Sequence, residues 1–333
     1  LSAPVRAPRE GEVRRVLRGG RAPAGGAASG AAAVKATLEA HDYRIDADAK
    51  LGHDDDKSAF LENAHETLDA RYETFNHYLA EDDWDLFFGV FMTTDRVNHF
   101  LFGDYANDTD DAAGFLEFYR ALDEYVGRLY DSLPEDVSLV IASDHGFTEL
   151  RHEVHCNAWL AEEGYLTYDT DEPESLADLG ADTEVFSLIP GRFFVNLEGR
   201  EANGSVSEGE YETVRDRLVD DLTALTGPDG DPVCADVYLG EDVFDGPAAD
   251  IAPDVVAVPA DGFDLKAGFS GSKPVFGEGP RNGMHKFSNA TLVTDDDRIA
   301  VDDVDLYDLT PTLLDLLEID VDADFDGRSL MRA

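Results

Sequence analysis

The feature that most constrains the fold is a pair of apolar runs on either side of a segment with helical periodicity. Residues 86–92 read Leu-Phe-Phe-Gly-Val-Phe-Met, and residues 137–142 read Val-Ser-Leu-Val-Ile-Ala. A run that is apolar at successive positions predicts a strand covered on both faces, as in the centre of a parallel sheet. Apolar residues step by three and four across residues 111–132, which predicts a helix. Strand, helix and strand in this order predict a βαβ unit, and therefore an α/β fold with a doubly wound, mostly parallel sheet.

Two more helices are expected, one on each side of this pattern. Apolar positions step by three and four across residues 58–79, as on one face of an amphipathic helix. Close to the C-terminus, Thr310 is followed by Pro311, which matches an N-cap followed by proline at the first helical position. We therefore predict a final amphipathic helix that begins at Thr310.

Composition divides the chain into four parts. Residues 1–35 consist mostly of Ala, Gly, Arg and Pro without helical or strand periodicity, and we expect a disordered or non-native segment there. Residues 36–150 are predicted to form the α/β core, and residues 251–333 to return to it. Residues 151–250 are predicted to form a smaller inserted cap that contacts the substrate.

The region after residue 150 differs in character from the core. It is richer in Gly and Pro and contains short strand-like pieces at residues 192–197 and 233–239. An acidic helix is predicted near residues 207–226, and residues 254–259 read as a further buried strand.

The net charge of the chain excludes two classes of binding protein. The chain has 26 Lys and Arg against 72 Asp and Glu, a net charge of −46. Residues 1–35 contain seven of the basic and two of the acidic side chains, so the remainder is even more acidic than the average. Such a field repels nucleic acid and anionic membranes, which excludes a constitutive binder of either.

Molar salt shortens the Debye length to about 3 Å and removes most of the self-repulsion of such an acidic chain. The composition predicts a cytoplasmic protein of a salt-accumulating organism, the alternative being an acidic protein of ordinary solubility.

The cysteines and the lengths of the apolar runs bear on disulfides, thiolate metal clusters and membrane spans. Cys156 and Cys234 form no CxxC pair, so neither a disulfide framework nor a thiolate zinc cluster is expected, and two free thiols are predicted. The longest apolar runs fall far short of the roughly 20 residues that a membrane span needs. The sequence therefore predicts no membrane-spanning helix.

Metal-ligand side chains follow the first apolar run. Asp95 and His99 lie four residues apart, so on a helix that starts here both side chains lie on one face. A carboxylate and an imidazole together suit Zn²⁺ or Mn²⁺. A solvated helix start would show the same spacing, so this pair alone does not identify a metal site.

Two further segments carry similar side chains. Ser143, Asp144 and His145 directly follow the second apolar run, with Gly146 to turn the backbone, and His285 lies in a Gly-rich loop. In open parallel sheets ligands bind at the carboxyl ends of the strands. Taken singly, these segments also fit a capped turn and an ordinary surface loop. Together with the first pair they predict a three-ligand site and most of a second one, as in enzymes where two divalent ions about 4 Å apart hold a phosphoryl group.

The order of these motifs resembles that of the alkaline phosphatase superfamily. The similarity extends through residues 308–314 and 326–330, and within the superfamily it is greatest to the type I phosphodiesterase/nucleotide pyrophosphatase group. Residues 190–192, 196–200 and 203–204 resemble the prokaryotic branch of predicted phosphohydrolases and phosphomutases. The resemblance covers residues 36–333.

This resemblance implies a site with two divalent ions, with Zn²⁺ favoured and Mn²⁺ the alternative. Asp95, His99 and His285 would hold the ion that binds the hydrolytic water. Asp144 and His145 would hold the ion that activates the nucleophile. The implied reaction is cleavage of a small phosphate mono- or diester. A phosphomutase or sulfatase-like member of the same superfamily, or a non-catalytic metal-binding relic, are the alternatives, and no motif specifies the substrate or the oligomeric state.

The sequence departs from the family pattern at its start. Such enzymes need an Asp at the end of the first strand and then a nucleophilic Thr or Ser, and both would precede residue 36. Residues 1–35 contain no Asp, and Ser2 and Ser29 follow no apolar strand. We therefore expect this chain to lack the nucleophile, half of one metal site and at least one core strand. The DNA upstream of codon 36, read in all three frames, tests whether residues 1–35 are an out-of-frame product.

Three more residues are candidates for contact with substrate. Arg96 lies beside Asp95 and would reach a phosphate, or else form a structural ion pair. His152 and His155 follow the Asp-His-Gly segment and would line the substrate cleft, or else belong to an ordinary loop.

Overall fold

The computed structural model describes residues 35–80 and 84–332, and the chain forms two compact units. Unit 1 takes in the described residues up to Asn98, Asp108–Gly146, and the described residues from Phe287 on. Unit 2 takes in His99–Asn107 and Phe147–Lys286. Apart from Lys35, the segment predicted to be non-native lies outside the described residues.

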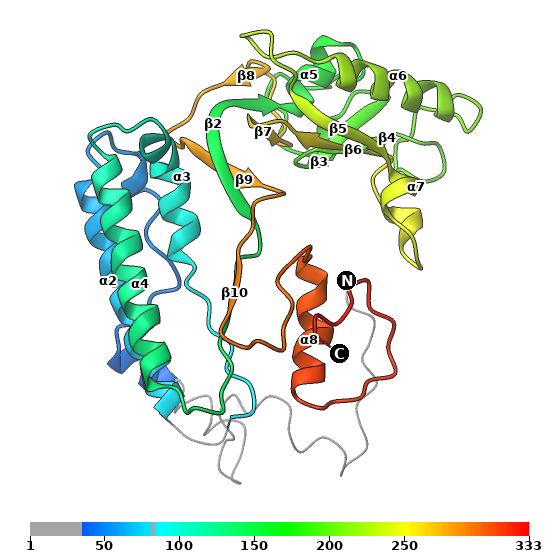
Figure 1. The fold of residues 1–333 in the computed structure, drawn as a ribbon. Coiled ribbons are helices and arrows are strands. Elements are labelled where there is room, and N and C mark those ends of the chain that lie inside the picture. The colour runs from blue at the N-terminus through cyan, green and yellow to red at the C-terminus, as the bar shows by residue number, and fades with distance from the viewer. Residues whose placement is uncertain (1–34, 81–83, 333) are drawn as a thin grey trace. The chain divides into compact units, whose positions relative to one another are not determined.

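Two long helices dominate unit 1 and lie side by side (Figure 1). They are α2 (Ser58–Ala80), preceded by the short 3-10 helix η1 (Leu51–His53), and α4 (Ala112–Ser132). Gly114 lets them approach closely, because a Cβ there would lie 2.4 Å from Leu61 Cδ1. The tyrosine rings of Tyr72 and Tyr125 stack with their centroids 4.3 Å apart. The helices predicted over residues 58–79 and 111–132 are thus confirmed to within a residue or two.

The sheet in unit 1 is smaller than predicted, and the expectation of a doubly wound, mostly parallel sheet is not confirmed. Among the strands of the described residues, β1 (Val140–Ala142) pairs only with β10 (Leu292–Thr294), and the pairing is antiparallel. Residues 86–92 contain no strand, and the side chain of Phe88 is 77% exposed. An apolar run forms a central strand only where neighbouring strands accept and donate its ladder hydrogen bonds. Within residues 35–80 and 84–332 no strand pairs with this segment, so the α/β class holds but the parallel core does not.

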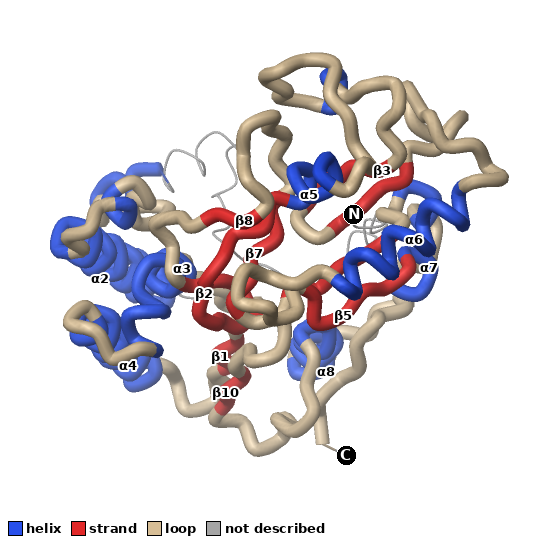
Figure 2. The backbone as a smooth tube through the Cα atoms, turned by 90° about the horizontal axis from the view of Figure 1, so that it is seen from above, coloured by secondary structure: helices blue, strands red, loops and turns tan. Residues whose placement is uncertain are grey.

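Unit 2 contains two four-stranded sheets (Figure 2). In the first, β2 pairs with β7 in parallel and with β8 antiparallel, and β9 also pairs with β2. The second is antiparallel in the order β3-β4-β6-β5. The strands are β2 (Gly146–His155), β3 (Val185–Ile189), β4 (Arg192–Val195), β5 (Cys234–Leu239), β6 (Val255–Pro259), β7 (Gly262–Lys266), β8 (Phe276–Gly277) and β9 (Gly283–Lys286). The strands predicted near residues 192–197, 233–239 and 254–259 are confirmed.

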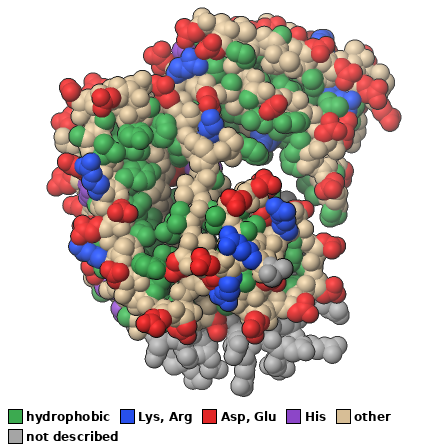
Figure 3. Space-filling model, viewed as in Figure 1, with side chains coloured by type: hydrophobic (Ala, Val, Ile, Leu, Met, Phe, Trp, Pro, Cys, Tyr) green, Lys and Arg blue, Asp and Glu red, His purple; other side chains and the backbone are tan. Residues whose placement is uncertain are grey.

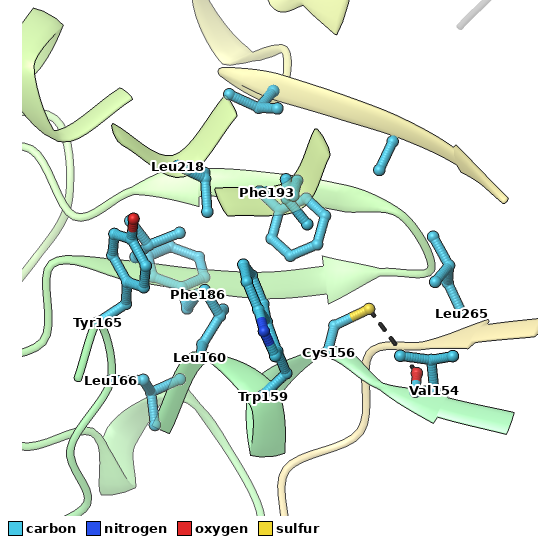
Figure 4. Packing of buried hydrophobic residues seen from close by; sticks show 14 of the residues in the cluster. Val154, Cys156, Trp159, Leu160, Tyr165, Leu166, Phe186, Phe193, Leu218 and Leu265 are labelled. Atoms are coloured by element: carbon cyan, nitrogen blue, oxygen red, sulfur yellow. Dashed lines mark hydrogen bonds between the residues drawn. The ribbon is translucent and has the colours of Figure 1, made fainter. Parts of the chain in front are cut away.

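The core of unit 2 fills the space between its sheets and helices. The helical elements are α5 (Cys156–Glu162), η2 (Leu176–Asp178), α6 (Tyr211–Ala224), α7 (Gly240–Val243) and η3 (Ala249–Ile251). Leu160, Phe193 and Leu218 are fully or almost fully buried and pack in one cluster (Figure 4). Because the cluster draws on α5, β4 and α6, burial of apolar surface is what joins these elements. The acidic helix predicted near residues 207–226 is α6.

A buried carboxylate ties three segments of unit 2 together. Asp254, 5% exposed, accepts bonds from Arg200 Nη1 at 2.8 Å and Nη2 at 2.6 Å. Tyr211 Oη donates to the same carboxylate at 2.6 Å, and the backbone N–H of Val195 donates at 2.6 Å. Burial, together with the bond to Asp254, raises the pKa of Tyr211 to about 12. The carboxylate therefore stays fully paired within the apolar core.

The final helix is confirmed, but its cap is not the predicted one. The 3-10 helix η4 (Leu306–Asp308) leads directly into α8 (Leu309–Leu316), so the helical turn begins before Thr310. The Asp308 carboxylate accepts the backbone N–H groups of Asp305 at 3.1 Å and Arg328 at 2.8 Å. These bonds lower the pKa of Asp308, because they favour its charged form. Asp308, rather than Thr310, therefore organises the start of this helix.

Both cysteines are free thiols in unit 2, as predicted. Burial raises the pKa of the Cys156 thiol to about 11 and that of Cys234 to about 12. The helices of the described residues include none long and apolar enough to cross a membrane.

Replacing Asp254 tests the buried carboxylate. The D254A variant removes the buried partner of the Arg200 guanidinium and leaves it only Glu201 and the Val195 carbonyl, and we expect the free energy of unfolding to fall by about 3 kcal/mol. Urea denaturation in 2 M KCl measures the change. D250A, at an exposed aspartate, serves as the control and should change stability by less than about 0.5 kcal/mol. Equal effects of the two variants would contradict this account.

The thiols provide a second test. At pH 8 both are almost entirely protonated, and only the thiolate attacks a disulfide reagent. We expect both cysteines to react slowly with Ellman's reagent in the folded protein and rapidly after unfolding in guanidinium chloride. Absorbance at 412 nm follows the reaction, and rapid labelling of Cys156 in the folded protein would contradict its burial.

Candidate metal centre

Helix α3 (Thr93–Ala106) carries two of the candidate ligands on consecutive turns. Asp95 lies in the first turn, where the helix dipole favours a carboxylate. His99 follows one turn later and is 8% exposed. Val97 and Leu101 are fully buried and anchor the helix. The helix start expected at the Asp95–His99 spacing is therefore present.

Three candidate ligands lie close together within unit 1. The Nε2 atom of His145 is 3.8 Å from Asp95 Oδ1 and 3.7 Å from Asp144 Oδ1. The Asp144 side chain is 81% exposed, whereas those of Asp95 and His145 are about a quarter exposed. Gly146 lets Asn289 approach the chain directly after His145, because a Cβ there would lie 1.6 Å from Asn289 Oδ1. The arrangement directs an imidazole nitrogen toward two carboxylates.

The other two candidate ligands meet within unit 2. The rings of His99 and His285 have centroids 4.8 Å apart. His99 Nδ1 lies 3.0 Å from the carbonyl oxygen of Gly283. A carbonyl only accepts hydrogen bonds, so Nδ1 carries the proton, and in this tautomer of the neutral ring Nε2 is the nitrogen with ligand character. The Phe147 ring packs edge-on against both imidazoles, at 5.1 Å and 5.2 Å.

The five predicted ligands thus fall into two groups, each formed within one unit. Asp95, Asp144 and His145 form the first, and His99 and His285 form the second. Carboxylate oxygens and imidazole nitrogens suit a borderline divalent cation such as Zn²⁺ or Mn²⁺. The Gly283 carbonyl sets the tautomer of His99 that can act as a metal ligand. The residues present therefore fit a divalent metal ion.

The three predicted substrate contacts are engaged within the protein. Arg96 pairs with Asp46, with Nη2 at 2.9 Å from Oδ2. His152 Nε2 lies 3.6 Å from Asp229 Oδ2. His155 is 6% exposed and its Nδ1 lies 2.8 Å from the carbonyl oxygen of Pro274.

Sequence reasoning gave no role to Phe147, although it adjoins the Asp-His-Gly motif. Its packing against His99 and His285 depends on contacts across more than 40 residues of sequence, which no local pattern reveals. The only signal was its position next to Gly146.

Comparison with known families decides the classification. The family model described as "Type I phosphodiesterase / nucleotide pyrophosphatase" matches residues 23–288, more than half of the chain. The chain belongs to this family. Membership places it in the alkaline phosphatase superfamily, as the motif order indicated, and in a family of hydrolases that generally use divalent metal ions. The match includes all five candidate ligands and begins ahead of residue 36, where the resemblance was expected to start. No curated protein shows a significant match to the sequence.

Proposed function

We propose that this protein is a metal-dependent phosphohydrolase that acts on phosphate mono- or diesters of small molecules. The observation that carries the proposal is a family match that includes all five candidate ligands. The carboxylate–imidazole group in unit 1 and the imidazole pair in unit 2 support it.

We assign the ligands as the family resemblance implies. Asp95, His99 and His285 hold one divalent ion, and Asp144 and His145 contribute to holding a second, with Zn²⁺ favoured over Mn²⁺. Bound ions of this kind lower the pKa of a coordinated water or hydroxyl and offset charge on phosphoryl oxygens. The chain itself orients the ligands: the Gly283 carbonyl fixes the His99 tautomer, and Phe147 restrains both imidazole rings.

The two threonines beside Asp95 are the first residues to consider as the nucleophile. Of the two threonines beside Asp95, Thr93 is 1% exposed, and Thr94 Oγ1 donates to the carbonyl of Phe91 at 2.9 Å. Neither presents its hydroxyl to a substrate. This supports the inference that neither Thr93 nor Thr94 is the nucleophile, and a metal-binding relic is kept as the second candidate.

Metal binding tests the ligand assignment. We expect the protein in 2 M KCl to bind Zn²⁺, and the H99A and H285A variants to bind it at least about 10-fold more weakly, because each removes a ligand. Competition with a chromophoric chelator measures the affinity. H152A, at a histidine paired with Asp229, is the matched control and should bind as the parent does. An unchanged affinity in H99A and H285A would refute the assignment.

Turnover separates the two candidate functions. Hydrolysis of p-nitrophenyl phosphate or bis-p-nitrophenyl phosphate that stops with EDTA and in D95N supports a hydrolase, and the preferred ester distinguishes monoesterase from diesterase. Release of p-nitrophenol from the sulfate ester instead identifies a sulfatase-like member. Bound Zn²⁺ without turnover of any ester supports the relic.

We also propose that the protein works in the cytoplasm of a salt-accumulating organism. Acidic side chains are spread over the face in Figure 3, where fewer Lys and Arg side chains are visible. At a net charge of −46 the folded chain repels itself unless salt screens the charges.

Salt dependence checks this proposal. We expect the thermal unfolding midpoint to rise steeply between 0.1 M and 2 M KCl, because screening relieves repulsion more in the compact state than in the expanded one. Circular dichroism measures the midpoint, with a neutral osmolyte at equal osmolality as the control. A midpoint independent of KCl would contradict high-salt adaptation.

A further inference from the structure

Asn282 joins the loop before β9 to helix α3, three residues ahead of His285. Its backbone N–H donates to the carbonyl of His99 at 2.9 Å, and its Oδ1 accepts the N–H of Gly103 at 3.1 Å. Its Nδ2 donates to Asp104 Oδ2 at 2.7 Å, and its carbonyl accepts the N–H of Leu150 at 2.8 Å. All four of its polar groups are therefore engaged within unit 2.

These contacts fix the loop against a particular turn of α3. His99 and Gly103 are four residues apart, so their carbonyl and N–H are the groups that an α-helix pairs with each other. Asn282 bonds to both, one with its backbone and one with its side chain. The next residue, Gly283, accepts the His99 Nδ1–H. The turn of α3 that carries His99 thus holds the segment that carries His285.

Gly103 is necessary for this approach. A Cβ at that position would lie 2.9 Å from both the Cβ and the carbonyl oxygen of Asn282, closer than packed atoms allow. Any larger residue would push the loop away from α3. The close contact and the four hydrogen bonds together leave the loop a single register on the helix.

We propose that Asn282 is a positioning residue for the metal centre, which sets His285 against His99 so that both imidazoles reach one ion. This inference rests on the proposed function. Groups that orient metal ligands without touching the ion typically contribute about 10–100-fold to metal affinity. Asn282 bonds to the backbone of the helix that carries His99 and lies in the loop that leads to His285. Its removal therefore widens the range of His99–His285 separations and weakens metal binding.

The first test replaces Asn282 and a matched asparagine. N282A should lower the Zn²⁺ affinity by about 10–100-fold and alter the visible absorption of the Co²⁺-substituted protein, which reports ligand geometry. Asn157 is the control: it is fully buried in unit 2, and its Nδ2 donates to the carbonyls of Ser187 at 2.8 Å and Ala267 at 2.9 Å. N157A should reduce stability while leaving the Zn²⁺ affinity and the Co²⁺ spectrum of the folded protein unchanged.

A charge swap provides rescue should N282A fail to fold. N282D keeps the acceptor for Gly103 but places a carboxylate against Asp104, so it should weaken Zn²⁺ binding. Adding D104N restores a donor opposite the new carboxylate and should recover most of the affinity. The G103A variant does not alter Asn282 itself, but its added Cβ should displace the loop and so weaken Zn²⁺ binding.

The outcomes separate this inference from the proposed function. If the parent protein binds no Zn²⁺, the proposed function fails and the inference fails with it. If the parent binds Zn²⁺ and H285A does not, while N282A and N282D bind as tightly as the parent, only the positioning role is overturned. Loss of affinity in N282D that D104N reverses supports the proposal.

Discussion

The hydrogen bond between His99 Nδ1 and the carbonyl of Gly283 is the interaction on which the candidate site depends. It decides which nitrogen of a buried imidazole carries the proton, and hence which one is available to a metal ion. A histidine at this depth without such a partner would have no defined tautomer. The bond also joins the strand that bears His285 to α3, alongside the hydrogen bonds that Asn282 makes to the same helix.

The sequence predicted the helices well because their signal is local. The spacing of apolar residues over 58–79 and 111–132 is complete within each segment, and α2 and α4 follow it. Strand pairing is not local: Ala142 pairs with Leu292, and no pattern near either residue indicates the other. The run at residues 86–92 had the composition of a central strand, but a strand also needs neighbours, which composition does not supply.

The candidate ligands were predictable for a similar reason, and their supports were not. Asp95 with His99, and Asp144 with His145, show their chemistry through spacing and position alone. The role of Asn282 depends on Gly103, which is 179 residues away. An asparagine between an arginine and a glycine in a loop reads as an ordinary turn residue. Residue type thus indicated the candidate ligands, whereas the residue proposed to position them could be recognised only from the fold.

The two cysteines have a further consequence for how the molecule opens. Both belong to unit 2, and the chain has no others. A buried thiol becomes visible to solvent only when the structure around it opens, locally or as a whole. Modification of the buried Cys156 thiol therefore reports when unit 2 opens. Unit 1 contains no cysteine, so this labelling does not respond to openings confined to unit 1.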